Sequence, residues 1–203
     1  MKKLTIHSAA AIAALIALAG CATGIGSSPL PGMNHGTSGA STTAGGHGPA
    51  DGGRHNSADT MFAQMMIPHH AQAVDMSDTM LAKTALDPRI TALAKDIKAA
   101  QGPEITKMTT WLAGWGEPAA MAGNHAMDGM MTADDLGKLT AAQGIEASKL
   151  FLAQMVAHHE GAVKMARTEV TGGKNAHAVD LAKDIIAAQE SEIKSMKDLL
   201  ATL

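Results

Sequence analysis

The sequence predicts an all-α protein, a four-helix bundle built from two repeated helical hairpins. Residues 62–76 and 151–165 share a pattern of Phe, Met, two adjacent His and a final Met, and residues 93–112 and 181–200 share a second pattern. Both patterns place apolar residues at the spacing of an amphipathic helix. The aromatic content is only 2%, which argues against β-sandwiches and β-barrels, because their strands draw on aromatic residues. Two hairpins with one apolar face each would bury those faces on each other.

Residues 1–20 are predicted to be a bacterial lipoprotein signal peptide. Two lysines precede a short apolar run, residues 6–18, and the sequence Leu-Ala-Gly-Cys that ends at Cys21 resembles a lipobox. Such a run is too brief for a usual membrane span, although an uncleaved anchor is the alternative interpretation. We expect cleavage before Cys21, lipidation of Cys21 and attachment to a lipid bilayer. The protein would then face the periplasm or the exterior of the bacterial cell envelope.

Residues 21–56 are predicted to form a flexible tether. They are rich in Gly, Ser, Thr and Pro and include three His, with no periodic apolar pattern. Such a segment cannot bury enough surface to offset its ordering entropy. The formal net charge of the whole chain is −3, which excludes nucleic-acid binding through a basic surface. A single Cys excludes an intramolecular disulfide and a Cys-based zinc site.

The folded domain is expected over residues 57–203. Its parts are repeat one, a Met-rich connection and repeat two, at residues 57–115, 116–144 and 145–203. The expected long helices lie near residues 58–84, 88–115, 145–171 and 175–202. Ser57 or Asp59 can cap the first of them, and Gly172-Gly173 closes the third. A short further helix is expected from Thr132, which has Asp135 at the spacing of a capping box.

Polar side chains fall on the apolar faces of these helices, at equivalent places in the two repeats. Helical spacing points two adjacent His of each first helix, and a Gln and a Glu of each second helix, toward the interior. Burying such groups without partners costs roughly 2–7 kcal/mol each, so they must pair with each other, reach water or bind a ligand. The inward residues are His69, His70, Gln101, Glu104, His158, His159, Gln189 and Glu192.

Two interpretations of this inward set stay open. In the first, buried His–Glu pairs fix the register of the helices, and each of Glu104 and Glu192 lies within reach of an inward His. In the second, the His bind a metal. Met66 and Met155 lie three and four residues before the two His pairs, and side chains meet at that spacing on a helix. Thioether and imidazole groups together suit Cu(I). The inward Gln and Glu residues would then orient these ligands. They are Gln101, Glu104, Gln189 and Glu192.

The connection between the repeats carries a second cluster of soft ligands. Its members are Met121, His125, Met127, Met130 and Met131. A Gly-rich polar segment offers no core for these Met side chains to fill, so accessory copper binding is one interpretation. The other is a segment that packs on the helices. Three Met residues on the helical apolar stripes are instead expected to fill the core: Met80, Met108 and Met196.

The two repeats also carry the motifs of a known family: Phe62, Met66, His69-His70 and Met76, their second copy, and the Gln-x-x-Glu-Ile motifs that follow. On these motifs, residues 57–203 resemble the bacterial "domain of unknown function 305" family. The resemblance implies a ferritin-like helical bundle and kinship with exported, methionine-rich copper-binding proteins implicated in copper resistance. The ligand set that it implies is Met66, His69, His70, Met76, Met155, His158, His159 and Met165. Pro68 has Ala157 as its counterpart, so the sites of the two repeats need not be equivalent.

We therefore expect a non-enzymatic envelope lipoprotein that binds copper, as Cu(I), for metal buffering or resistance. A structural or partner-binding lipoprotein with register-fixing His–Glu pairs is the alternative. A di-iron or di-manganese oxidase is disfavoured, because ferritin-like enzymes use Glu-x-x-His motifs that the predicted bundle helices lack. The chain also shows no pattern typical of a hydrolase or a nucleotide-binding enzyme.

Overall fold

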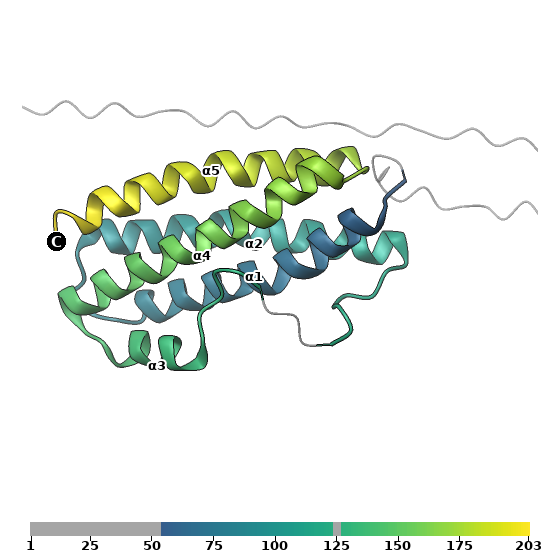
Figure 1. Cartoon of the computed structure of the whole chain (residues 1–203). Helices are drawn as coiled ribbons and strands as arrows, with labels where there is room; N and C mark the ends of the chain where they lie inside the picture. The colour runs from purple at the N-terminus through teal and green to yellow at the C-terminus, as the bar shows by residue number, and fades with distance from the viewer. Residues whose placement is uncertain (1–53, 124–126) are drawn as a thin grey trace, which may run out of the picture. The chain divides into compact units, whose positions relative to one another are not determined.

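The structure is a computed structural model that describes residues 54–123 and 127–203. These residues form five helices and no strand (Figure 1). The helices are α1 (Ser57–Leu81), α2 (Pro88–Trp115), α3 (Ala133–Ala141), α4 (Gly144–Gly172) and α5 (Ala176–Leu200). The predicted all-helical class is therefore confirmed. The signal peptide, Cys21 and nearly all of the tether lie outside the described residues. Within the described part, every helix is too short or too polar to span a membrane.

The long helices pair as the internal repeat predicts. Helix α1 packs along α2, and α4 packs along α5, so each repeat forms one helical hairpin. The two hairpins meet mainly through α1 and α4. The short helix α3 belongs to the connection between the repeats and packs against α4 and α1. Because the His-His motifs lie on α1 and α4, this pairing brings the two motifs toward each other.

Local sequence explains the helix ends, with one correction. The N-cap of α1 is Asn56, and not Ser57 or Asp59. Asn56 has the extended backbone that an N-cap requires, its side chain accepts bonds from amides of the first turn, and Asp59 completes a capping box. The predicted capping box of α3, between Thr132 and Asp135, is confirmed.

The core consists of two apolar clusters with a polar layer between them. Members of the first include Met76, Met80, Ile97, Phe151, Met155 and Met196. Members of the second include Phe62, Met66, Met108, Leu112, Ala162 and Ile185. The eight inward residues predicted from the sequence lie between the two clusters along each long helix. The three Met predicted to fill the core, Met80, Met108 and Met196, are fully buried.

Candidate metal centre

Four buried imidazoles form the middle of the polar layer. His69 and His70 of α1, and His158 and His159 of α4, are all fully buried. The ring centroids of His69 and His158 are 3.8 Å apart and the rings are tilted by 38°. The sequence alone suggested one site in each repeat. The structure instead brings one His of each repeat face to face, across the contact between α1 and α4.

The outer His of each motif pairs with a glutamate of its own hairpin. His70 Nε2 donates to Glu104 Oε2 at 2.8 Å, and His159 Nε2 donates to Glu192 Oε2 at 2.6 Å. The predicted closeness of these glutamates to inward His is therefore confirmed. The side chains of Glu104 and Glu192 are 22% and 26% exposed, whereas the two imidazoles are fully buried. Because a carboxylate can only accept, the Nε2 atoms of His70 and His159 each carry a proton.

The inner His residues leave several nitrogen atoms without partners. His69 Nε2 donates to the carbonyl oxygen of Asp128 at 3.2 Å, so its lone pair lies on Nδ1. His158 has no hydrogen-bond partner at either nitrogen, and Nδ1 of the other three His has none. The side-chain oxygens of Gln101 and Gln189 are likewise buried and unpaired. Buried polar atoms are nearly always paired in folded proteins, so this concentration of unpaired atoms makes the layer the candidate place for a ligand or for ordered water.

Burial keeps the inner imidazoles neutral. Desolvation lowers the pKa of His69 to about 4, with the carbonyl of Asp128 opposing the shift. Desolvation, and then the neighbouring His69, lower the pKa of His158 to about 2. At neutral pH both rings are therefore uncharged, and no proton competes with a metal ion for their lone pairs.

Thioethers lie beside the layer on both sides. Met66 belongs to one apolar cluster and Met155 to the other, and both are fully buried. Met76 is buried in the cluster of Met155, whereas Met165 is partly buried against the cluster of Met66. Within the described residues, no three His, Cys, Asp or Glu side chains gather as a metal site. An ion held in the layer would therefore take thioether ligands together with imidazoles, which is a soft ligand set.

The connection packs over the His pair. The side-chain amide of Gln72 on α1 bonds the backbone of Met131 in both directions, at 3.0 and 2.7 Å. On α4, a Cβ at Gly161 would overlap the carbonyl oxygen of Asp128, so only glycine allows this approach. Gly129, at φ +82°, makes the matching turn. The packed connection predicted as one alternative is thus observed at residues 127–131.

The connection also carries the predicted accessory ligands. Met121, Met127, Met130 and Met131 are partly buried, and Met131 packs against the first apolar cluster. His125 lies outside the described residues. Accessory copper binding by this segment stays a prediction.

A buried acid pair near the N-terminus of α1 was not predicted from the sequence. Asp59 accepts bonds from the backbone amides of Asn56, Lys174 and Asn175 at 2.6, 3.0 and 2.9 Å. Burial alone would raise the pKa of Asp59, but the hydrogen bonds from Glu169 and these amides lower it. Glu169 is 1% exposed, and burial with the nearby Asp59 raises its pKa to about 8. Glu169 is therefore protonated at neutral pH and donates to Asp59.

Comparison with known proteins agrees with the fold and the motifs. The family model described as domain of unknown function (DUF305) matches residues 59–200. No curated protein matches the chain. A DUF305 protein of Streptomyces coelicolor, described as secreted, is 36% identical with a TM-score of 0.69, over 72% of this chain and 93% of its own. A DUF305 fragment from Deinococcus radiodurans is 28% identical with a TM-score of 0.66, over 73% of this chain and 98% of its own.

A third similar protein has been crystallised with metals. CopM in its Cu(I)-bound form is 34% identical to this chain, with a TM-score of 0.60, over 71% of this chain and 96% of CopM. CopM has also been solved in Cu(II)-bound, Ag-bound and apo forms. The family match covers nearly the whole folded part, from the capping box of α1 to the end of α5, and the chain belongs to the DUF305 family.

Proposed function

We propose that this chain binds copper, as Cu(I), in the polar layer between α1 and α4, and that it buffers the metal or protects against it. The observation that carries the proposal is the buried contact of His69 with His158, with Met66 and Met155 buried in the two apolar clusters on either side of the layer. Imidazole with thioether is a ligand set that suits Cu(I). The Cu(I), Cu(II) and Ag forms of CopM, a similar protein, support the same chemistry.

The protein's own residues would prepare this site for a soft ion. Glu104 and Glu192 hold the protons of their partner imidazoles on Nε2, which directs each Nδ1 lone pair elsewhere. The carbonyl of Asp128 does the same for His69. Because the imidazoles are fully buried, water does not compete for the ion. We propose a binding protein and not an enzyme, because fully buried imidazoles leave no room for a substrate beside them.

The proposed cellular setting is that of an envelope lipoprotein facing the periplasm or the exterior. The lipobox at Cys21 carries this part of the proposal, and the Streptomyces relative, described as secreted, supports export. For the architecture we propose the ferritin-like four-helix bundle. A di-iron or di-manganese oxidase is disfavoured, because the described residues gather too few carboxylates for hard metal ions.

A structural role is the second candidate function, and the two His–Glu pairs favour it. Each pair joins the two helices of one hairpin, so the pairs could serve only to fix the register of the helices. This alternative does not explain why both nitrogens of His158 lack partners.

An anaerobic titration separates the two candidates. The full chain is titrated with Cu(I) against a chromophoric chelator, beside His69→Gln/His158→Gln and the control His177→Gln, which changes an exposed His. Gln keeps polarity but lacks an imidazole nitrogen, so we expect the double variant to lose at least about 100-fold in Cu(I) affinity. The control should bind like the unchanged chain. Unaltered Cu(I) binding by a helical but less stable double variant would refute the copper proposal.

A further inference from the structure

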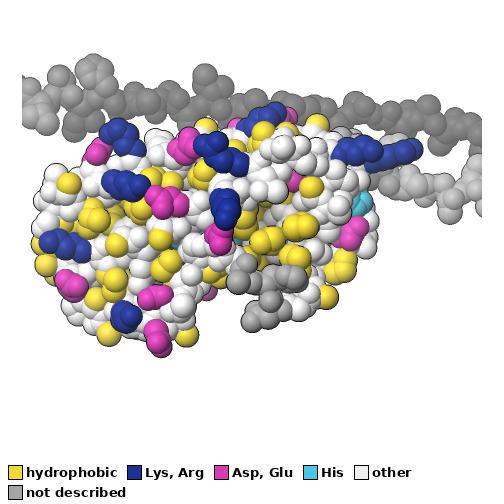
Figure 2. Space-filling model, in the orientation of Figure 1, with side chains coloured by type: hydrophobic (Ala, Val, Ile, Leu, Met, Phe, Trp, Pro, Cys, Tyr) yellow, Lys and Arg dark blue, Asp and Glu magenta, His cyan; other side chains and the backbone are white. Residues whose placement is uncertain are grey.

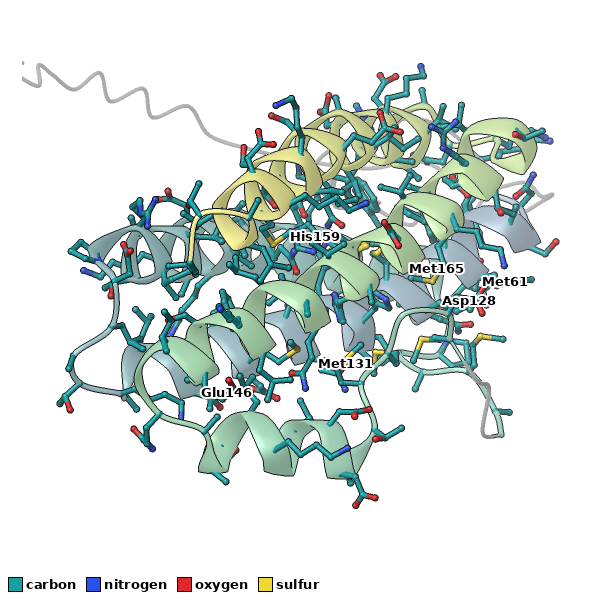
Figure 3. All side chains as sticks on the ribbon, turned by 60° about the vertical axis from the view of Figure 1, so that its left-hand side comes forward. Met61, Asp128, Met131, Glu146, His159 and Met165 are labelled. Carbon is teal, nitrogen blue, oxygen red and sulfur yellow. The ribbon has the colours of Figure 1, made fainter. Side chains whose placement is uncertain are left out.

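A pocket of about 320 Å³ opens between α1, α4 and the connection. Its lining is mainly apolar and includes Met61, Phe62, Met65, Asp128, Met165 and Glu169. Figure 3 shows Met61 of α1, Met165 of α4 and Asp128 of the connection beside one another at this place. On the face drawn in Figure 2, hydrophobic side chains reach the surface between the N-terminal half of α1 and the C-terminal half of α4. The pocket is therefore open to solvent and rich in methionine.

Three thioethers meet in this pocket. Met61 and Met65 are one helical turn apart on α1, a spacing at which side chains are neighbours, and Met165 comes from α4. Met61 is 45% exposed, whereas Met66, Met76 and Met80 on the same helix are buried. A methionine that only fills a core gains nothing from exposure. A sulfur that must meet an incoming soft ion has to be reachable.

The pocket adjoins the polar layer through one residue. Asp128 lines the pocket, and its carbonyl oxygen accepts the hydrogen bond from His69 Nε2. The side chain of Asp128 pairs with Lys164, which also lines the pocket. Phe62 lines the pocket and lies in the same apolar cluster as Met66. The pocket and the polar layer thus share Asp128 and the apolar cluster of Phe62 and Met66.

We propose that Met61, Met65 and Met165 form a solvent-facing acceptor site for a soft monovalent ion, from which Cu(I) passes to the His layer. This inference rests on the proposed function of the layer. The transfer is a ligand exchange: each imidazole–metal bond forms as a thioether–metal bond breaks, and copper stays in the +1 state. The thioethers are aprotic, so they release the ion without taking up or losing a proton.

The first measurement uses Ag(I) as a probe, because it is a soft monovalent ion and is not oxidised under air. Methionine methyl NMR signals of the full chain are followed during an Ag(I) titration. We expect the methyl signals of Met61, Met65 and Met165 to shift, and to shift in His69→Gln/His158→Gln as well. Buried Met80, Met108 and Met196 serve as internal references. Unmoved signals of the three pocket methionines would overturn the proposal.

The second measurement is the rate at which the layer is loaded. The variant Met61→Leu/Met65→Leu keeps apolar volume, removes two of the three pocket sulfurs and leaves Met165 unchanged, and Met80→Leu/Met108→Leu is its control in the core. With Cu(I) supplied as a chelate, we expect the pocket variant to load at least about tenfold more slowly, with affinity changed by less than about threefold. Loading at the rate of the control variant would overturn the proposal.

The two proposals fail in different ways. Suppose that the pocket methyl signals shift with Ag(I) while His69→Gln/His158→Gln keeps its full Cu(I) affinity. The proposed function of the layer is then wrong, and so is the transfer to it, but the thioether site is still supported. If the His variant loses Cu(I) affinity while the pocket signals stay fixed, the acceptor site is wrong and the function of the layer remains.

Discussion

The two repeats bring the same polar residues to the layer, yet their inner His residues differ. The pairs His70–Glu104 and His159–Glu192 are alike in both hairpins. His69 bonds the carbonyl of Asp128 in the connection, whereas its counterpart His158 makes no such bond to the connection. The matching pairs follow from the repeated sequence. The difference follows from the connection, a segment that occurs once and lies over the contact between the repeats.

The connection packs against equivalent positions of the two repeats, but through different kinds of contact. Gln72 and Gly161 occupy the same place in the repeat, at the offset of 89 residues. Gln72 holds Met131 by hydrogen bonds, and Gly161 lets the backbone of Asp128 approach because it has no side chain. A duplicated scaffold can therefore become asymmetric through one changed residue at one position in each copy.

The largest expected effect comes from Gly161→Ala. The added Cβ would overlap backbone atoms of Asp128 and Gly129, which cannot move aside as a flexible side chain can, so we expect a loss of about 3 kcal/mol in unfolding free energy. Gln72→Ala should lose about 1–2 kcal/mol, through its two hydrogen bonds. Urea unfolding measures both. Gly114→Ala is the control, because nothing lies within 4 Å of its Cβ position; a Gly161→Ala chain as stable as this control would contradict the close approach.

The next effect concerns Glu169, whose counterpart in the first repeat is Met80. Its folded pKa of about 8 lies above the ordinary value of 4.5. Between these pH values the folded chain binds a proton that the unfolded chain lacks, so unfolding free energy falls as pH rises and levels off above about 8. Glu169→Gln keeps a donor to Asp59 without titrating. We expect it to remove this fall and to be more stable by about 2 kcal/mol near pH 8.

Urea unfolding at a series of pH values tests the Glu169 prediction. Glu160→Gln is a suitable control, because Glu160 is an exposed glutamate of the same helix, paired with Lys197. The control should show the same pH dependence as the unchanged chain. A Glu169→Gln chain that still loses stability between about pH 4.5 and 8 would assign the dependence to other groups.

A smaller effect should separate the two inner His residues in the metal-free chain. His158→Leu removes a buried ring with two unpaired nitrogens, so we expect a gain of about 1–2 kcal/mol in unfolding free energy. His69→Leu should gain less, or lose, because it leaves the carbonyl of Asp128 without its donor. Thermal unfolding of the two variants gives the ranking. The reverse ranking would mean that the contact with Asp128 does not distinguish the repeats.

The smallest expected effect is a loss of Cu(I) affinity that should be the same in both repeats. Glu104→Gln and Glu192→Gln remove the charge that holds each partner imidazole in its tautomer. We expect each to weaken Cu(I) binding by about tenfold, and by the same factor, if both outer imidazoles serve one centre. Chelator competition measures the two affinities. A large effect of one variant and none of the other would show that only one hairpin supplies ligands.

The sequence predicted what helical spacing alone determines. A period of 3.6 residues decides which side chains face inward, so the eight polar residues of the layer and the buried Met80, Met108 and Met196 were found correctly. The contacts between His and Glu followed because each pair lies within one hairpin. The lipobox at Cys21 and the ligand role of the Met and His residues stay predictions.

What the sequence did not predict depends on contacts between the hairpins. Spacing within a helix does not tell which helices meet, so the face-to-face approach of His69 and His158 was not foreseen. The bond from His69 to Asp128 is made by a backbone carbonyl, which no side-chain pattern reports. Glu169 was not predicted, because its counterpart in the first repeat is the apolar Met80 and the internal repeat therefore does not mark it.

The position of the polar layer also limits where this chain can change in length. One residue inserted into α1 between Phe62 and His69 would turn the rest of the helix by about 100° and take its imidazoles off the inward face. The same holds for each of the other long helices. Segments between helices carry no such restriction, and there the repeats do differ: residues 82–87 join α1 to α2, but only residues 173–175 join α4 to α5. We therefore expect insertions and deletions to be tolerated in the segments between the helices and not within the long helices.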